Sequence, residues 1–233
     1  SLLKSMKKKG INKLIFSSTA AVYQQSSKPL KENSKLQSLS TYAKTKLICE
    51  KKINKQKNMK SVILRFFNVC SALDKPIFGE LHNPETHLIP TIVYKAIYNK
   101  KIYIYGNDFP TTDGTCVRDY IHIKDICSAI EKSIKFLISK KKSEIFNIGN
   151  YKGLSNNQII NSIKKNISKS LNLHYVGRRK GDSPQLVCNS DKAQRLLSWS
   201  SKNSKIEKII KDEVNWIKKL KTMKLKRRFK TYL

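Results

Sequence analysis

Short apolar runs alternate along the chain with longer segments whose apolar residues have helical spacing. The sequence NKLIFSS at residues 12–18 is typical of a strand buried on both faces of a parallel sheet. Residues 41–56 have the pattern of a helix, and a second buried strand, SVILRFFNV, is expected at residues 61–69. A strand, a helix and a strand in this order predict a right-handed crossover within a parallel sheet.

The remaining segments continue the mixed pattern. Residues 1–10 resemble the last turns of an amphipathic helix that ends at Gly10, and residues 71–90, with three prolines, predict a loop. Further helices are expected at 91–100, 122–138, 155–167 and 190–199, the third of them capped by Ser155, and strands at 101–106 and 144–150. The basic segment 218–230 is interpreted as a solvated, frayed helix end.

This order predicts an α/β protein: the C-terminal part of a Rossmann-type parallel sheet joined to a smaller α/β domain. We expect the sheet portion at residues 1–75, the smaller domain mainly at 76–220 and a basic tail at 221–233. The strand at 144–149 is a candidate to return to the first sheet.

The chain is strongly basic, with 48 Lys and Arg against 16 Asp and Glu and a formal charge of +32. Such a charge suggests a nucleic acid or an anionic surface as partner. The lysines, however, are spread over the whole length together with many Asn, Ile and Ser residues, the pattern of drift toward A/T-rich codons. We therefore favour compositional drift and expect neither a nucleic acid nor a membrane as partner, with a phosphate-bearing substrate as a further reason for positive charge.

The cysteines and histidines predict neither disulfides nor a metal centre. The five cysteines form no C-x-x-C pair, which favours reduced thiols in a cytoplasmic protein. His82 and His87 lie near Glu80 and Glu85, but Pro84 interrupts them and no H-E-x-x-H spacing exists, so we interpret all four as loop residues. No apolar run approaches the roughly 18 residues that span a bilayer.

Tyr42 and Lys46 are a candidate acid/base pair. On a helix, residues four apart lie on one face, so the two side chains can act at one point. An ammonium roughly 5 Å from a phenol, at an effective dielectric constant near 20, favours the phenolate by about 3 kcal/mol, or about two pKa units. Ser17, Ser18 and Thr19 end the preceding strand, at the sheet edge where open α/β folds bind ligands.

Several longer motifs carry a specific resemblance. They are FSSTAAVY, YAKTK, LRFFN, HLIP, YGNDFPTTDGTCVRDYIHIKD, FNIG and GRRKGD, and they occur in this order over essentially the whole chain. Together they resemble the UDP-glucose 4-epimerases of the extended short-chain dehydrogenase/reductase family. The resemblance implies interconversion of UDP-glucose and UDP-galactose, in which bound NAD takes a hydride from carbon 4 and returns it to the other face.

The resemblance also assigns roles by position. Tyr42 is expected to be the acid/base, Lys46 to hold the nicotinamide ribose and lower the tyrosine pKa, and Thr19 to relay the proton. Ser17, Ser18 and Phe66 are expected beside NAD. The positions that match the UDP-sugar site are Asn68, His87, Leu88, Tyr105, Arg118, Arg179, Asp182 and Leu186.

Simpler interpretations stay open for three of these positions. Arg118 with Asp119 is alternatively a structural ion pair, Arg179 with Asp182 a charged turn, and Asn68 a strand-end cap.

Some positions depart from the family pattern. Gln24 stands where glycine is usual, and NVCSA stands where an Ala-Gly pair is common. Leu186 replaces a bulky aromatic found in some members, which suggests room for an N-acetylated hexosamine. Related decarboxylases and 4,6-dehydratases are alternatives, but the dehydratases carry an acidic pair where this chain has Ala20 and Ala21.

The glycine-rich turn that binds the dinucleotide pyrophosphate in this family has no counterpart in the sequence. Because the chain also begins at Ser1 inside a helix, we expect it to lack roughly the first hundred residues of the family. Two hypotheses follow: an epimerase polypeptide completed by an amino-terminal fragment, or a truncated, inactive remnant. A homodimer is left open.

Overall fold

The parallel strands expected from the apolar runs form the first of the sheets. The structure of the protein is a computed structural model, and it describes residues 2–75, 78–82 and 84–222. The strands β1 (Lys13–Thr19), β2 (Lys60–Phe66) and β6 (Glu144–Ile148) are parallel in the order β1-β2-β6. Leu64 pairs with Ser17 on one side and with Phe146 on the other. These parallel strands and their covering helices confirm the α/β class.

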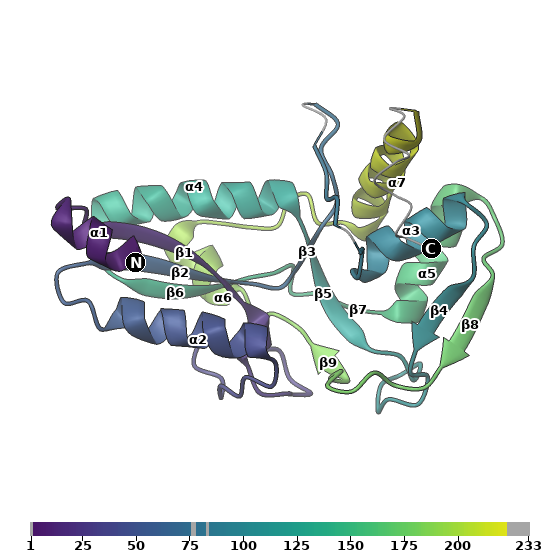
Figure 1. The fold of residues 1–233 in the computed structure, drawn as a ribbon, viewed down its shortest axis with the longest axis horizontal. Coiled ribbons are helices and arrows are strands. Elements are labelled where there is room, and N and C mark those ends of the chain that lie inside the picture. Colours follow the sequence, from purple (N-terminus) through teal and green to yellow (C-terminus); the bar gives the residue numbers. More distant parts are fainter. Residues whose placement is uncertain (1, 76–77, 83, 223–233) are drawn as a thin grey trace.

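Two long helices cover this sheet. The helix α2 (Thr41–Asn54) and the helix α4 (Ile123–Lys140) lie on opposite sides of it, as Figure 1 shows. The helix α6 (Asp191–Leu197) contacts β6, and α1 (Leu2–Lys8) precedes β1. Gly10 follows α1 with a φ of +68°, as expected for a residue that closes a helix in the left-handed conformation.

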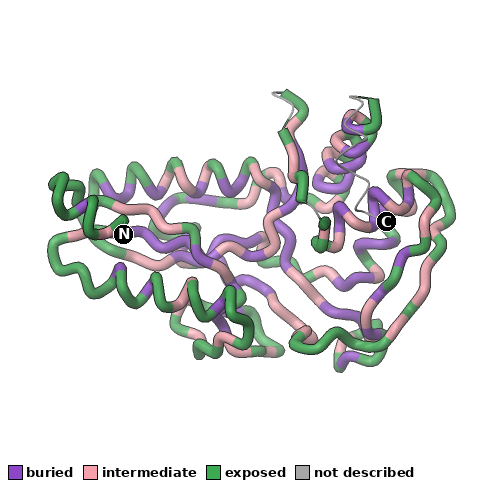
Figure 2. Tube along the Cα trace, viewed as in Figure 1, coloured by how far each residue is buried: buried purple, intermediate pink, exposed green. Residues whose placement is uncertain are grey.

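The expectation that the first strand is buried on both faces was wrong. Along β1 only Ser18 is fully buried, whereas β2 is buried from Ser61 to Arg65. Within the described residues β1 is an outer strand, so a neighbour covers one of its edges only. Figure 2 shows the same contrast between the central and outer parts of the sheet.

The apolar segment 61–69 forms two strands rather than one. The strand β2 ends at Phe66, and after Phe67 the strand β3 (Asn68–Cys70) joins a second sheet beside β5 (Val117–His122). The strands β7 (Gly153–Ser155) and β9 (Gln185–Leu186) also pair with β5. The sequence pattern did not predict β5, because Arg118 and Asp119 interrupt its apolar residues.

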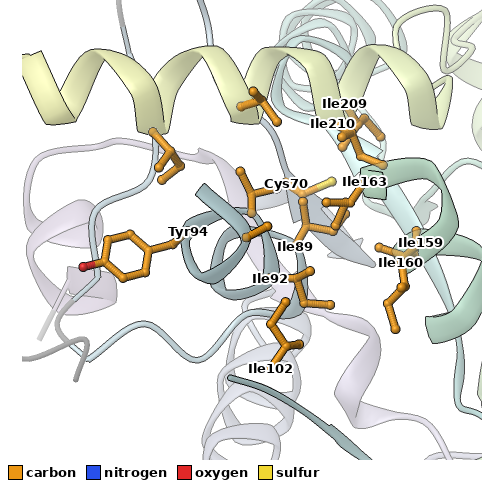
Figure 3. Packing of buried hydrophobic residues seen from close by; sticks show 14 of the residues in the cluster. Cys70, Ile89, Ile92, Tyr94, Ile102, Ile159, Ile160, Ile163, Ile209 and Ile210 are labelled. Atoms are coloured by element: carbon orange, nitrogen blue, oxygen red, sulfur yellow. The ribbon is translucent and has the colours of Figure 1, made fainter. Parts of the chain in front are cut away.

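A second core lies around three helices at the other end of the molecule. They are α3 (Leu88–Ile97), α5 (Asn156–Ile167) and α7 (Ile206–Thr222), and they pack beside the parallel strands β4 (Ile102–Tyr105) and β8 (Leu173–Val176). Figure 3 shows Ile92, Ile160 and Ile210 among the side chains that fill this core.

One helix end in this part of the molecule agrees with the expected signal, and two helices depart from the expected bounds. Ser155 caps α5 in a capping box with Gln158, as predicted. The helix α3 begins within the predicted loop, since Pro90 is tolerated in a first turn. The helix α7, most of which was not predicted, includes the first residues of the basic segment, and residues 223–233 of that segment lie outside the described residues.

The pairing of β6 with β2 places residues 144–148 in the same sheet as β1 and β2. The division into residues 1–75 and 76–220 stays a prediction. Among the described helices, none is both long enough and apolar enough to cross a lipid bilayer.

Candidate active site

A cleft of about 1110 Å³ opens at the carboxyl ends of β1 and β2 and extends toward α3 and β5. It gathers residues that are far apart in the sequence, as the crossover topology predicts for this edge of a parallel sheet. The predicted site residues that line it are Ser17, Ser18, Thr19, Tyr42, Lys46, Phe66, Asn68, His87, Leu88, Tyr105, Arg118, Arg179 and Asp182.

The first turns of α2 present Tyr42 and Lys46 to this cleft. Ser40 caps the helix, its hydroxyl accepting a hydrogen bond from the Ala43 N–H at 3.1 Å. The Lys46 ammonium lies 5.8 Å from the centre of the Tyr42 ring and donates to the Ser17 carbonyl at 2.8 Å. The Tyr42 side chain is 56% exposed, so its phenol is open to a ligand.

The hydroxyls at the end of β1 have different environments. Ser18 borders the cleft, but its Oγ already donates its proton to the buried Glu50 carboxylate at 2.5 Å. Thr19 Oγ1 accepts from the Ala21 N–H at 3.2 Å and caps a short helical turn at Ala20–Val22. Thr19 can still donate its hydroxyl proton.

Two arginines line the opposite part of the cleft. Arg118 on β5 donates to the Ser183 carbonyl at 2.7 Å and has an Nη2 atom 3.7 Å from the Asp182 carboxylate. The Arg179 guanidinium lies 3.7 Å from the centre of the Tyr105 ring, stacked as a cation on an aromatic face. Planar guanidinium groups at this position suit a diphosphate.

The alternative pairing of Arg118 with Asp119 is wrong, because Arg118 pairs with Asp182. Asp119 is fully buried and accepts hydrogen bonds from the backbone N–H groups of Asn150, Tyr151 and Cys188. Burial raises the pKa of Asp119 to about 7, against the opposing effect of these N–H groups. Asp119 is therefore a structural residue that joins three segments.

The two other simpler interpretations were a charged turn for Arg179 with Asp182 and a strand-end cap for Asn68, and each has partial support. Asp182 and Arg179 do form a turn, since the Asp182 N–H donates to the Arg179 carbonyl at 3.2 Å, yet both line the cleft. Asn68 begins β3 and also borders the cleft.

Leu186 is the predicted site residue that lies apart from the cleft lining. It pairs with Arg118 in the sheet register, and its side chain packs on a buried cluster that includes Val22, Phe67 and Cys188. The expectation that Leu186 borders the sugar and leaves room for an N-acetyl group does not fit this packing, because the side chain is occupied in a core.

Glu80 and Glu85 also border the cleft, and sequence reasoning assigned them only to a loop. Both carboxylates contact His87 and, together, they raise the pKa of that imidazole to about 10. The proline-interrupted segment gave no periodic signal, although the spacing of its histidines and glutamates was visible in the sequence.

Comparison with known proteins identifies the family of this chain. Residues 1–149 match the model of the NAD dependent epimerase/dehydratase family. A UDP-glucose 4-epimerase of Lacticaseibacillus casei is 39% identical over 220 residues, which are 92% of this chain and 66% of that relative. The chain thus spans about two thirds of the length of that relative.

Solved structures have the same fold. The UDP-glucose 4-epimerase of Stenotrophomonas maltophila, with bound NAD and formylated UDP-arabinopyranose, superposes with a TM-score of 0.90 at 29% identity, over 95% of this chain and 68% of that one. The UDP-Glc/GlcNAc 4-epimerase of Campylobacter jejuni has a TM-score of 0.76 at 32% identity, over 94% of this chain and 68% of that one. With the family model matched over residues 1–149, these similarities show that the chain belongs to the NAD dependent epimerase/dehydratase family.

Proposed function

We propose that this chain carries the acid/base and sugar-nucleotide residues of an enzyme that interconverts UDP-glucose and UDP-galactose with NAD. The observation that carries the proposal is the single cleft that holds Tyr42 and Lys46 at one end and Arg118 and Arg179 at the other. The similarity to UDP-glucose 4-epimerases supports the choice of substrate.

The residues at the carboxyl end of β1 fit a nicotinamide riboside. Lys46 uses one of the three N–H donors of its ammonium on the Ser17 carbonyl, which leaves two donors for the hydroxyls of a ribose. Phe66, at the end of β2, supplies an apolar border for the ring. When bound, NAD would supply the oxidant that accepts and returns a hydride at carbon 4 of the hexose.

Tyr42 would hold and move the proton in this reaction. As a phenolate, Tyr42 would take the proton from the 4-hydroxyl, and as the resulting phenol it would give a proton back to the 4-oxygen of the product. The Lys46 ammonium lies 5.8 Å from the centre of the Tyr42 ring, on the same side of α2. Thr19 can pass the proton between the sugar hydroxyl and Tyr42 through its own O–H.

The other end of the cleft would bind the UDP portion. Arg118 and Arg179 would face the two phosphates with forked donors, and the Tyr105 ring beneath Arg179 would hold its guanidinium plane in place.

A hexosamine substrate is the second candidate, and it rests on the likeness to the Campylobacter jejuni enzyme rather than on Leu186. We favour the hexose, because the position of Leu186 removes the argument for a widened sugar pocket.

The outer position of β1 suggests a further requirement for activity. Among the residues that the structure describes, one edge of β1 is unpaired, and such an edge can pair with another strand. We propose that turnover requires an amino-terminal, dinucleotide-binding fragment that pairs with this edge. The alternative is an inactive remnant that binds UDP-sugar without turning it over.

One set of measurements separates these proposals. Calorimetry of the purified chain with UDP-galactose should show saturable binding that Arg179→Ala weakens by at least about tenfold, the value of one lost charged hydrogen bond. Interconversion with added NAD should appear when an amino-terminal fragment of a relative is supplied. Binding without turnover in any combination would support the remnant, and absence of binding would contradict the proposed function itself.

A further inference from the structure

Four metal-ligating side chains converge in the loop between β3 and α3. They are Glu80, His82, Glu85 and His87, and each offers one ligand atom such that all four atoms lie within 4.8 Å of one another. Two imidazoles and two carboxylates form a donor set that suits zinc and other borderline divalent transition metals.

The distances between these donors are close to those around a bound ion. His82 Nδ1 and His87 Nδ1 lie 3.1 Å and 2.8 Å from the same Glu80 oxygen, and His87 Nδ1 lies 3.1 Å from Glu85 Oε1. Ligands about 2.0–2.1 Å from a tetrahedral zinc ion are roughly 3.3–3.5 Å apart. These three imidazole–carboxylate pairs would lengthen by a few tenths of an ångström around a metal ion, and the other donor pairs lie within 4.8 Å of one another.

A buried carboxyl group without a hydrogen-bond partner in the part of the chain that the structure describes lies beside the cluster. Glu213 on α7 is 0% exposed, and among the described residues neither of its side-chain oxygens has a hydrogen-bond partner. Burial, with the charges of Glu80 and Glu85, raises the pKa of Glu213 to about 8. A buried polar group without a partner calls for an explanation, and a ligand-binding role of the adjacent cluster would supply one.

Contacts with α7 hold the cluster in place. The Trp216 indole N–H donates to the Glu80 carbonyl at 2.8 Å, and its ring lies so close to Gly79 that a Cβ atom there would be 2.4 Å from it. Glu85 is fixed by the backbone N–H groups of Thr86 and His87, at 2.8 Å and 2.7 Å. Ligands that are held by their surroundings lose less freedom when a metal binds.

We propose that Glu80, His82, Glu85 and His87 form a binding site for a zinc-class divalent metal ion at the border of the cleft. The ion takes the place of the proton that the imidazoles share with Glu80 and Glu85, and it holds the four ligand side chains together. Its role is structural, and it takes no part in the proton and hydride steps.

The test is metal titration of the full chain without a histidine tag, after removal of metal with a chelator. One equivalent of Zn²⁺ should bind, and Co²⁺ should give the intense visible absorption of a tetrahedral site. His82→Gln should weaken Zn²⁺ binding by about 10- to 100-fold or more, at least the cost of losing an outer-shell partner. His174→Gln, on β8 away from the cluster, is the matched control and should leave binding unchanged.

Because the His82 side chain is exposed, its replacement should leave the protein folded, and circular dichroism checks this. If His82→Gln were nevertheless unfolded, the wild-type Co²⁺ spectrum would decide, since an octahedral spectrum contradicts the tetrahedral donor set. Equal effects of the two variants, or the absence of a stoichiometric Zn²⁺ site, would overturn the proposal. The experiment measures binding of the metal alone, so its outcome is independent of epimerase activity.

Discussion

Tyr42 is the residue whose replacement tests the proposed chemistry with the least structural disturbance. Its side chain is 56% exposed, so Tyr42→Phe removes a hydroxyl from the cleft without opening a cavity in the core. Turnover of UDP-galactose by the NAD-supplied, assembled protein should fall by about 10²- to 10⁴-fold, the usual contribution of a general acid/base. The melting temperature should not change.

Tyr98→Phe is a suitable comparison for Tyr42→Phe. Tyr98 follows α3, is also exposed and does not border the cleft. Its replacement should preserve turnover. Wild-type rates in Tyr42→Phe would show that another group moves the proton.

His122 makes the stability of the protein depend on pH. Its Nδ1 accepts the Lys124 N–H at 3.0 Å, and its Nε2 lies 3.1 Å from the Asp212 carboxylate. Burial lowers the pKa of this imidazole below its ordinary 6.5, although Asp212 opposes the shift. The unfolded chain therefore binds the proton first, so His122 should reduce stability as the pH falls through about 6.5.

His122→Asn should remove this part of the pH dependence. Asparagine can still cap α4 through its side-chain oxygen. Urea denaturation between about pH 7.5 and 5.5 should show a smaller loss of stability in the variant than in the wild type. His174→Asn is the control and should show the same dependence of stability on pH as the wild type. If the wild type and both variants showed the same dependence, His122 would not be its source.

At the scale of elements, a buried ion pair holds α2 against the sheet. Arg65 on β2 donates to both oxygens of Glu50 on α2, at 3.1 Å and 2.6 Å, and the same carboxylate accepts from Ser18 on β1. The pair therefore joins the helix that carries Tyr42 and Lys46 to the two strands beneath it. The ion pair therefore helps to hold α2 in its position on the sheet, because the helix itself buries few residues.

Glu50→Gln should leave the buried Arg65 guanidinium without its counter-charge. The expected cost is about 3–5 kcal/mol of unfolding free energy, because breaking a buried pair from one side leaves an uncompensated charge. Glu131→Gln, in the exposed pair with Lys135 on α4, is the matched control and should change stability little. Equal denaturation midpoints for the two variants would show that the pair does not anchor α2.

The elements that sequence patterns could predict are those governed by local signals. The Ser155 cap, the apolar stripe of α4 and the spacing of Tyr42 and Lys46 each depend on residues within a few turns of one helix. The strand β5 was missed because Arg118 and Asp119 are satisfied by partners distant in sequence. The division of 61–69 at Phe67, the packing of Leu186 and the Glu–His cluster likewise depend on tertiary contacts.

At the scale of the whole molecule, the outer position of β1 should be visible in hydrogen exchange. A strand with one neighbour bonds only alternate backbone amides across the sheet, whereas β2 has neighbours on both sides. In dilute solution the alternate amides of β1 should exchange far faster than those of β2, because they lack an acceptor.

Addition of the proposed amino-terminal fragment should protect these amides of β1 from exchange. If their protection rises instead with the concentration of the chain, the strand that pairs with β1 belongs to a second copy of the chain. Uniform protection of β1 in the dilute chain alone would contradict the open edge and, with it, the argument for strand pairing at that edge.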